Sequence, residues 1–218
     1  MIRKEVNFPN KSEGLAEFFG IMLGDGNLYI SEKKGGRCCQ IRIAGNYLKD
    51  YEYLTIFLNS LSKSLFNVEP RFSKLKGRNV LYLCMDYTNL GEILISIGFK
   101  PGNKIKNNIG IPYWIKKDKK FLAACIRGLF DTDGSMYELL PHWPGLFQIN
   151  FKNMCKALLD DTREGLLTLG INVSKISMGT KIYVTKRSEI DKFYKLIGTN
   201  NDRLGIKFRE FYEKSPMV

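Results

Sequence analysis

The chain contains two copies of one short segment, about half its length apart. Residues 15–26 have the sequence LAEFFGIMLGDG and residues 123–134 have AACIRGLFDTDG, so each copy is an apolar, helix-like stretch that ends in Asp-Gly. The two aspartates, Asp25 and Asp133, are 108 positions apart (133 − 25) in a chain of 218 residues. Self-similarity at a fixed interval indicates a structural unit that is used more than once. The sequence therefore predicts two related halves.

The segments that follow each copy also correspond. Each Asp-Gly is followed by two strand-like segments, and the second of them, CQIRIAG or FQINFK, alternates apolar with polar residues. Such alternation is typical of a sheet with one buried face. A helix, two further strands (70–75 with 79–85, and 173–178 with 181–185) and a short closing helix complete each half. The predicted fold class is α/β (α+β), with two pseudo-symmetric α-β-β-α-β-β-α halves that each contain an antiparallel sheet.

The stretch between the halves is rich in lysine and contains Pro101 and Pro112. Proline and polar clusters between periodic segments are typical of connecting loops. We therefore expect an N-terminal half over residues 1–100, a linker over residues 101–117 and a C-terminal half over residues 118–218.

Small residues spaced four apart predict that the two motif helices pack against each other. Gly20 and Gly24 lie on one face of the first helix, and Gly128 and Thr132 repeat this spacing in the second. Small side chains one turn apart allow two helix backbones to approach closely. We therefore expect the two motif helices to form the centre of the molecule.

This packing would bring Asp25 and Asp133 side by side at the C-terminal ends of two helices. Two carboxylates in that position repel each other and face the negative end of each helix dipole. A divalent cation removes this conflict, and carboxylate, carbonyl and water oxygens suit Mg²⁺. The sequence therefore predicts a metal site that could activate a water for attack on a phosphodiester.

Composition narrows the class of partner. Thirty-four Lys and Arg against 22 Asp and Glu leave a net charge of +12, which suits a polyanion. The longest apolar stretch, residues 121–130, is interrupted by Arg127, so we expect no membrane segment. His142 is the only histidine and the five cysteines form no CxxC pair, which argues against a zinc finger or a disulfide scaffold. Because the first residues lack an apolar h-region, we expect an intracellular protein of the cytoplasm, nucleoid or an organelle matrix.

The two copies resemble known motifs. FFGIMLGDG (residues 18–26) and IRGLFDTDG (residues 126–134) are similar to paired LAGLIDADG motifs, although the first copy has Leu23 in place of the first aspartate. The chain as a whole resembles a monomeric, two-motif LAGLIDADG homing endonuclease. The residues that match the motif are Gly20, Asp25 and Gly26 in the first copy, and Gly128, Leu129, Asp131, Asp133 and Gly134 in the second.

The resemblance implies a fold and an activity. The two sheets would be saddle-shaped and packed through two central LAGLIDADG helices. The protein would be a monomeric, site-specific double-strand DNA endonuclease of the intron-homing type, which cuts a long asymmetric target and leaves 3′ overhangs. Mg²⁺ would be the cofactor, Mn²⁺ could substitute, and Ca²⁺ would support binding without cleavage.

Two other functions fit the same scaffold. One is an RNA-binding intron maturase, acting alone or alongside cleavage, for which intron RNA would be a partner. The other is a non-catalytic DNA-binding regulator. Both Asp25 and Asp133 are retained, and neither a pure maturase nor a non-catalytic regulator needs them. The endonuclease is therefore the favoured prediction.

The resemblance also assigns roles to individual residues. Asp25 and Asp133 match the essential metal-binding acids, and the carbonyl groups of Gly24 and Thr132 match auxiliary metal ligands.

Basic or amide residues hold waters around the metals in this family. Lys181 is the best match to such a lysine, whereas Asn79 occupies the corresponding place in the first half. Gln40 and Gln148, each 15 residues past its aspartate, are candidates to position water or to contact bases.

The outward positions of the two sheets are the candidates for DNA contacts, because Arg and Lys bind guanine and phosphate while Asn and Gln bind adenine. In the first half these are Asn27, Tyr29, Ser31, Lys33, Arg37, Gln40, Arg42, Arg71, Ser73, Lys74, Lys76 and Arg78. In the second half they are Ser135, Tyr137, Gln148, Asn150, Lys152, Lys175, Ser177, Lys181 and Lys186. The halves differ at these positions, so we expect an asymmetric target.

Overall fold

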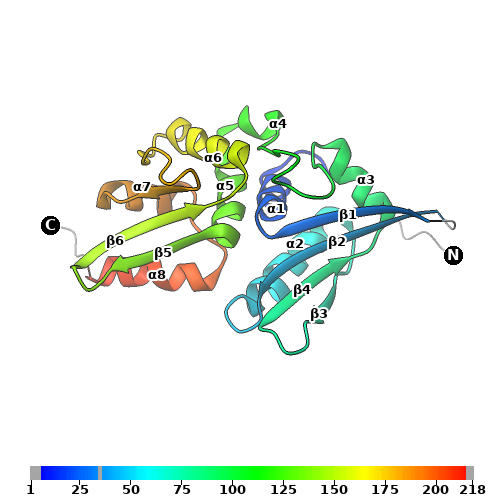
Figure 1. Ribbon diagram of the computed structural model, residues 1–218, viewed down its shortest axis with the longest axis horizontal. Helices are drawn as coiled ribbons and strands as arrows, with labels where there is room; N and C mark the ends of the chain where they lie inside the picture. The colour runs from blue at the N-terminus through cyan, green and yellow to red at the C-terminus, as the bar shows by residue number, and fades with distance from the viewer. Residues whose placement is uncertain (1–5, 34–35, 215–218) are drawn as a thin grey trace.

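The computed structural model of the chain describes residues 6–33 and 36–214, which form two lobes on either side of a central pair of helices (Figure 1). The first lobe has four antiparallel strands in the order β1-β2-β4-β3. Its elements are α1 (Glu13–Gly24), β1 (Gly26–Lys33), β2 (Gly36–Asn46), a π-helix η1 (Tyr53–Leu58), α2 (Asn59–Phe66), β3 (Arg71–Lys74), β4 (Val80–Met85) and α3 (Thr88–Ser96).

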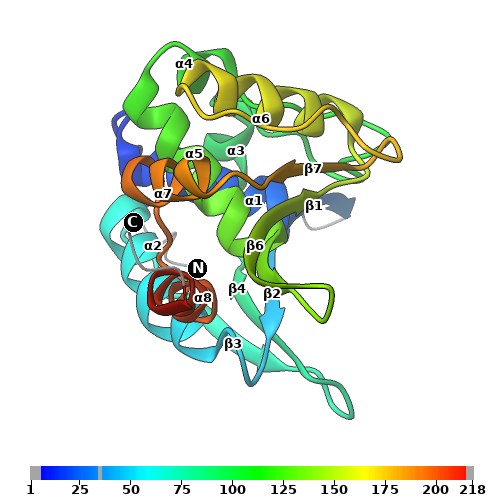
Figure 2. The ribbon, with the colours of Figure 1, turned by 90° about the vertical axis from the view of Figure 1, so that its left-hand side faces the viewer.

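The second lobe repeats this plan around a smaller antiparallel sheet, with the strand order β5-β6-β7. Figure 2 shows the β5–β6 hairpin on one side of this lobe and α7 and α8 on the other. The elements are α4 (Tyr113–Lys116), α5 (Lys119–Asp133), β5 (Gly134–Leu139), β6 (Trp143–Lys152), α6 (Lys156–Thr168), β7 (Lys181–Val184), α7 (Arg187–Leu196) and α8 (Asp202–Lys214).

The predicted fold class is confirmed, but two details of the second half differ. Residues 173–178 are not a strand, and only an isolated bridge joins Ser177 to Lys181. Side-chain hydrogen bonds replace part of the expected ladder, because the Tyr183 N–H donates to Ser174 Oγ (3.0 Å) and the Ser174 carbonyl accepts from Arg163 Nε (2.9 Å). The second difference is α8, an additional helix that the pattern of repeated elements does not include.

The central helices α1 and α5 pack closely, as predicted. A Cβ atom built on Gly20 would lie 2.0 Å from the Cys125 carbonyl oxygen, and one on Gly128 would lie 2.3 Å from the Glu17 carbonyl oxygen. A larger side chain at either glycine would therefore push backbone atoms apart. Glycine at these positions is what allows the two helices to meet.

Each sheet has one buried and one outward face. In β2, Ile41 and Ile43 are fully buried, and in β6, Ile149 and Phe151 are at most 5% exposed. The polar residues between them lie on the opposite face. In the part of the chain that the structure describes, no helix has the length and apolar character required to cross a membrane.

Candidate active site

Asp25 and Asp133 lie where α1 and α5 end together. Asp25 caps α1, with its N–H donating to the Ile21 carbonyl, and Asp133 is the last residue of α5. A Cβ atom built on Gly24 would lie 2.0 Å from Thr132 Oγ1 and 3.7 Å from the carboxyl carbon of Asp133. The contact between the helices therefore brings the two acidic residues to one place, and β1 and β5 begin at the next residue of each segment.

The surroundings of both carboxylates favour their protonated form. Burial among protein atoms, followed by repulsion from Asp133, raises the pKa of Asp25 to about 6, and the Lys104 ammonium opposes this shift. Burial also raises the pKa of Asp133, while a hydrogen bond from Asn153 and the charge of Lys104 lower it. Asp25 is nevertheless exposed to solvent, so its carboxylate is accessible to a metal ion. A cation at this position would relieve the repulsion from Asp133 that contributes to the raised pKa of Asp25.

We expect Ca²⁺ binding to weaken about tenfold between pH 7 and pH 5, because a carboxylate must be ionised to bind a metal. With a pKa of about 6, Asp25 is about nine-tenths ionised at pH 7 and about one-tenth ionised at pH 5. Isothermal titration calorimetry of the protein with Ca²⁺ at both pH values measures this change. An affinity that is equal at both pH values would show that Asp25 has an ordinary aspartate pKa.

Lys104 supplies a positive charge to this site from the segment between α3 and α4. Its Nζ donates to the carbonyl oxygens of Leu23 (2.9 Å) and Gly24. Burial lowers the pKa of Lys104, and the negative charges of Asp133 and Asp25 act in the opposite direction. Sequence reasoning missed this residue, because nothing distinguishes it from the other lysines of the linker.

Asn153 holds the carboxylate of Asp133. Its Nδ2 donates to Asp133 Oδ2 (2.7 Å), and its own Oδ1 accepts from the Cys155 N–H (2.8 Å), which fixes the amide. The strand registers pair Gly26 with Ile43 and Gly134 with Phe151, so the first-half counterpart of Asn153 is Gly45. The two aspartates are therefore supported differently, and comparison of the two halves could not have identified Asn153.

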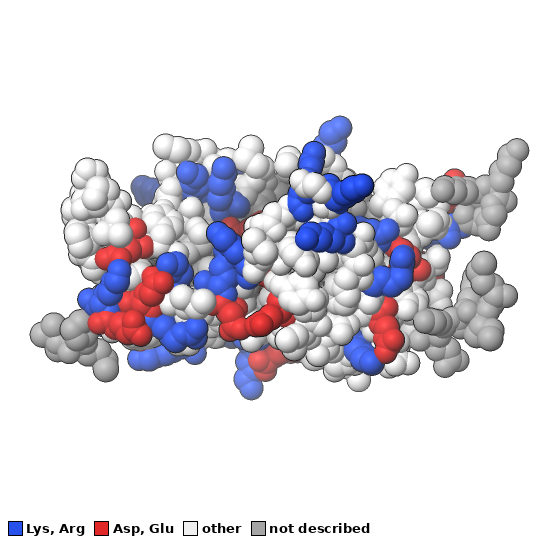
Figure 3. Space-filling model, turned by 90° about the horizontal axis from the view of Figure 1, so that it is seen from below, with Lys and Arg blue, Asp and Glu red and all other residues white. Residues whose placement is uncertain are grey.

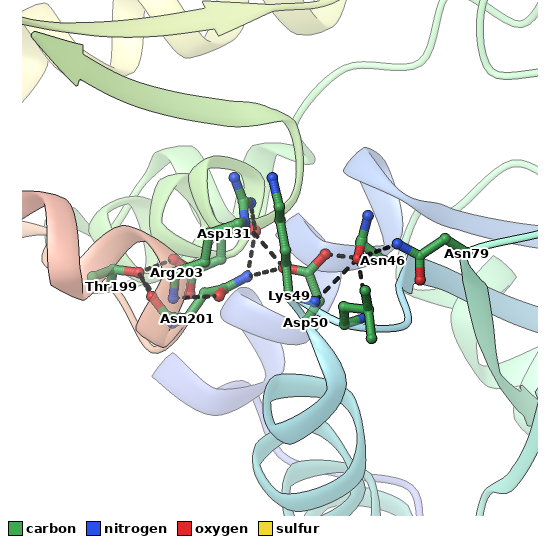
Figure 4. A network of polar contacts seen from close by, with 9 residues as sticks. Asn46, Lys49, Asp50, Asn79, Asp131, Thr199, Asn201 and Arg203 are labelled. Carbon is green, nitrogen blue, oxygen red and sulfur yellow. Dashed lines mark hydrogen bonds and ion pairs between the residues drawn. The ribbon is translucent and has the colours of Figure 1, made fainter.

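A polar network joins the turn after β2 to the helix that carries Asp133 (Figure 4). Asp50 Oδ1 accepts from Asn201 Nδ2 (2.9 Å) and Arg203 Nε (3.0 Å). The same two residues donate to the Asp131 carbonyl oxygen, at 3.1 and 3.2 Å. Burial raises the pKa of Asp131 to about 7, against hydrogen bonds from Thr199 and Asn200. The network therefore connects the two lobes at Asp131, which is two residues before Asp133.

The other residues with predicted catalytic roles lie further along the sheets. Gln40 pairs with Tyr29, and Gln148 pairs with Tyr137, whose hydroxyl donates to Gln148 Oε1 (2.8 Å). Each of these tyrosines is four residues after an aspartate. Each glutamine is therefore about 13 Å along the strand from the aspartate of its half. Lys181 begins β7 and pairs with Lys152, so it is about two strand spacings, or about 10 Å, from Asp133.

The other residues that the resemblance singles out around the metal site also have defined contacts. The Gly24 carbonyl accepts from Lys104, and the Thr132 hydroxyl donates to the carbonyl oxygens of Gly128 (2.9 Å) and Leu129 (3.0 Å). Asn79 Nδ2 donates to Asn46 Oδ1 (3.1 Å) in the network of Figure 4.

None of the candidate DNA contacts whose side chain the structure describes is buried, but they do not all lie on the outward faces of the sheets; the Lys33 side chain lies outside the described part. Arg37 and Lys74 share the strand face of buried Ile41 and Leu81, and Arg37 pairs there with Glu92 of α3. Lys175 lies beside α6, and Lys186 directly precedes α7. Exposed residues are Asn27, Tyr29, Arg37, Gln40, Arg71, Ser73, Lys74, Lys76, Arg78, Tyr137, Lys152, Lys175 and Lys186. Half-buried residues are Ser31, Arg42, Ser135, Gln148, Asn150, Ser177 and Lys181. Seen from below (Figure 3), the upper part of the view carries Lys and Arg with few Asp or Glu, whereas the lower part carries both signs of charge.

The donor set at the helix ends fits a hard divalent cation. Two carboxylates lie beside the Gly24 carbonyl oxygen, which already accepts a lysine ammonium and so suits a positive charge. Within residues 6–33 and 36–214, no three His, Cys, Asp or Glu side chains gather to hold a metal. Backbone, water or substrate oxygens would therefore complete the coordination, as is usual for Mg²⁺.

Comparison with known proteins agrees with this geometry. A family described as LAGLIDADG-like domain matches residues 120–198. The replication factor C small subunit of Methanocaldococcus jannaschii is 29% identical over 136 residues, which cover 60% of this chain and only 7% of that protein.

Solved structures extend the similarity to most of the chain. The homing endonuclease I-DmoI in complex with DNA and Mn superposes with a TM-score of 0.59 at 20% identity, covering 85% of this chain and 97% of that one. The I-SmaMI LAGLIDADG homing endonuclease bound to cleaved DNA gives a TM-score of 0.58 at 11% identity, covering 95% and 93%. The chain therefore has the fold of these LAGLIDADG homing endonucleases, and its residues 120–198 match the LAGLIDADG-like domain family.

Proposed function

We propose that this protein is a metal-dependent endonuclease that cuts both strands of double-stranded DNA at a long asymmetric target and acts as a monomer. The observation that supports the proposal is the pair of carboxylates, Asp25 and Asp133, at the adjacent C-terminal ends of α1 and α5. The outward faces of two sheets that carry basic residues flank this pair. The I-DmoI and I-SmaMI structures with this fold contain DNA, which supports the same class of partner here.

Asp25 and Asp133, with the carbonyl groups of Gly24 and Thr132, would hold Mg²⁺, with Mn²⁺ as a substitute and Ca²⁺ supporting binding alone. A metal held by these residues would supply Lewis acidity and activate water for attack on the phosphodiester. Asn153 keeps the Asp133 carboxylate oriented through its 2.7 Å hydrogen bond. Lys104 would supply a positive charge beside the site that stabilises the negative charge developing on the phosphate.

Other assignments extend this proposal. Lys181 and the two glutamines, Gln40 and Gln148, hold water or contact bases on the flanking sheets, and the cut leaves 3′ overhangs. The N-terminal half, residues 1–100, and the C-terminal half, residues 118–218, each serve one half of the target, with residues 101–117 as the linker. Intron homing is the biological context of this proposal.

We expect Lys104→Met to slow cleavage about 100-fold, because a positioned donor at a developing negative charge contributes about that much. DNA affinity should change only a few-fold, since Lys104 is one of many cations. Single-turnover cleavage rates at saturating protein measure the effect. Lys106→Met is the matched control, because Lys106 is an exposed lysine two residues away. Equal cleavage rates for Lys104→Met and the wild type would show that Lys104 has no role in the reaction.

A randomised duplex library tests the function as a whole. The protein is incubated with the library in Mg²⁺ and in Ca²⁺, and both the cut ends and the bound duplexes are sequenced. We expect cut ends that share one long asymmetric motif and a fixed 3′ stagger in Mg²⁺, and the same motif bound but intact in Ca²⁺. Selective binding without cutting in any divalent ion would support a regulator instead. If neither occurs, structured intron RNA becomes the next ligand to test.

A further inference from the structure

Asp86, directly after β4, contacts two arginines that belong to different strands. Its Oδ1 accepts from Nη1 of Arg42 in β2, and its Oδ2 accepts from Nη2 of Arg71 in β3. All three side chains reach the surface, with exposures of 28% for Arg42, 28% for Asp86 and 74% for Arg71. One carboxylate therefore holds two guanidinium groups on the outward face of the first sheet.

The strand register sets where these arginines lie. Arg42 and Arg71 both pair with Cys84 of β4, so the three residues form one row across β2, β4 and β3. Neighbouring strands are about 4.8 Å apart, which separates the two arginine backbones by about 10 Å. Cys84 is only 5% exposed beneath this row. The row is a short, ordered segment of the surface that would face DNA.

An acidic residue at this position is unfavourable for DNA binding taken alone, because it repels phosphate. It also contributes little to folding, since partly exposed ion pairs are weak and are screened by salt. Its distinct effect is on geometry. Each guanidinium is planar with a fork of donors, so fixing one edge orients the others. Among the described residues, Arg42 donates to the Ile41 carbonyl and to Asp86, and both hydrogen bonds use Nη1. The guanidinium edge formed by Nε and Nη2 is therefore available for a base.

We propose that Asp86 determines target specificity by holding Arg42 and Arg71 in the orientation that contacts guanine in the major groove. The inference rests on the proposed function and names which residues of the first sheet select the sequence. Guanine presents O6 and N7 to a bidentate arginine, and such a contact discriminates against other bases about 5- to 150-fold. An arginine free to rotate binds phosphate equally well but loses this discrimination.

This role predicts opposite changes in two affinities. Asp86→Ala removes a negative charge and releases two cations, so binding to an unrelated duplex should become several-fold tighter, with a steeper dependence on salt. At the same time, the preference for guanine at the positions contacted by Arg42 and Arg71 should fall at least fivefold. A residue that only stabilises the fold would weaken binding to every duplex alike.

The experiment compares four proteins, wild type, Asp86→Ala, Arg42→Ala and Glu92→Ala, by library selection in Ca²⁺ and by dissociation constants at several salt concentrations. Arg42→Ala identifies the base pair that Arg42 contacts. Glu92 is the matched control, because it is an exposed acid that pairs with Arg37 (3.6 Å) and contacts neither Arg42 nor Arg71. Circular dichroism establishes that each variant is folded.

We expect the Arg42-dependent guanine preference to be lost in Asp86→Ala and kept in Glu92→Ala. An unchanged preference in Asp86→Ala, or an equal loss in Glu92→Ala, would overturn the inference while the endonuclease proposal stands. A wild-type protein that selects no motif would overturn the proposed function and this inference with it.

Discussion

Asp25→Asn and Asp133→Asn are each expected to reduce the rate of DNA cleavage by at least about 10³-fold. Each substitution replaces a carboxylate by an amide, which removes a negative charge and one oxygen ligand from the metal site. Metal stabilisation of the transition state is worth several kcal/mol, and each 1.36 kcal/mol corresponds to a tenfold change in rate. DNA binding should be retained, because neither side chain is among the cations of the sheet faces. Single-turnover rates in Mg²⁺ and dissociation constants in Ca²⁺ measure both quantities.

Asp160→Asn is the matched control for these variants. Asp160 lies on α6 and pairs with Lys156 four residues earlier, so its loss leaves the helix ends of α1 and α5 untouched. Its cleavage rate should equal that of the wild type. Undiminished cleavage by either Asp25→Asn or Asp133→Asn would exclude that residue from the metal site.

Gly20→Ala is expected to destabilise the protein by about 3 kcal/mol, the upper end of the usual range for an overpacked core. The added Cβ would lie 2.0 Å from the carbonyl oxygen of Cys125 and 3.1 Å from the backbone nitrogen of Leu129. Both are backbone atoms of α5, so α1 and α5 must separate to accommodate it. The expected fall in Tm is about 6–12 °C for a chain of this size.

Gly205→Ala distinguishes this packing effect from the general consequence of replacing glycine in a helix. Gly205 lies within α8, and the nearest atom to an added Cβ is Arg209 Nη1 at 3.8 Å. Alanine there should stabilise the helix by about 0.5–1 kcal/mol. Thermal unfolding of both variants, followed by circular dichroism, gives the comparison. If Gly20→Ala unfolds at the same temperature as the wild type, α1 and α5 do not pack as closely as described.

The fold was predictable because the repeat and the strand periodicity constrain it strongly. Two copies of one element order, with small residues at Gly20, Gly24, Gly128 and Thr132, leave few arrangements other than a central helix pair. The missing strand over residues 173–178 is a departure that arises where a side chain replaces a backbone contact. Ser174 binds the Tyr183 N–H with its hydroxyl, and no strand pattern in residues 173–178 reveals that substitution.

The two aspartates of the site were identifiable from the sequence, whereas the residues that contact and orient them were not. Lys104 reaches the Gly24 carbonyl from 80 residues away in the chain, and its local sequence resembles that of its linker neighbours. Asn153 contacts Asp133, but its counterpart in the first half is Gly45, so the repeat carries no signal for it. Such residues are defined by tertiary contacts and not by spacing along the chain.

Asp86 illustrates the same limit on the outward face. Sequence periodicity places Arg42 and Arg71 among the DNA candidates, but it does not show that one carboxylate joins them. That link depends on the strand order β1-β2-β4-β3, which brings β2 and β3 to opposite sides of β4. Charge patterning therefore predicts a class of partner, and the sheet order determines which charges act together.

The proposed metal site at Asp25 and Asp133 is tested most directly by locating Mn²⁺ through its anomalous scattering in crystals of the protein bound to its selected duplex. We expect anomalous peaks between the carboxylates of Asp25 and Asp133 and the DNA phosphates, with Lys104 displaced from the Gly24 carbonyl. Mn²⁺ bound elsewhere on the protein, or no peak beside these carboxylates in a complex that cuts its DNA, would contradict it.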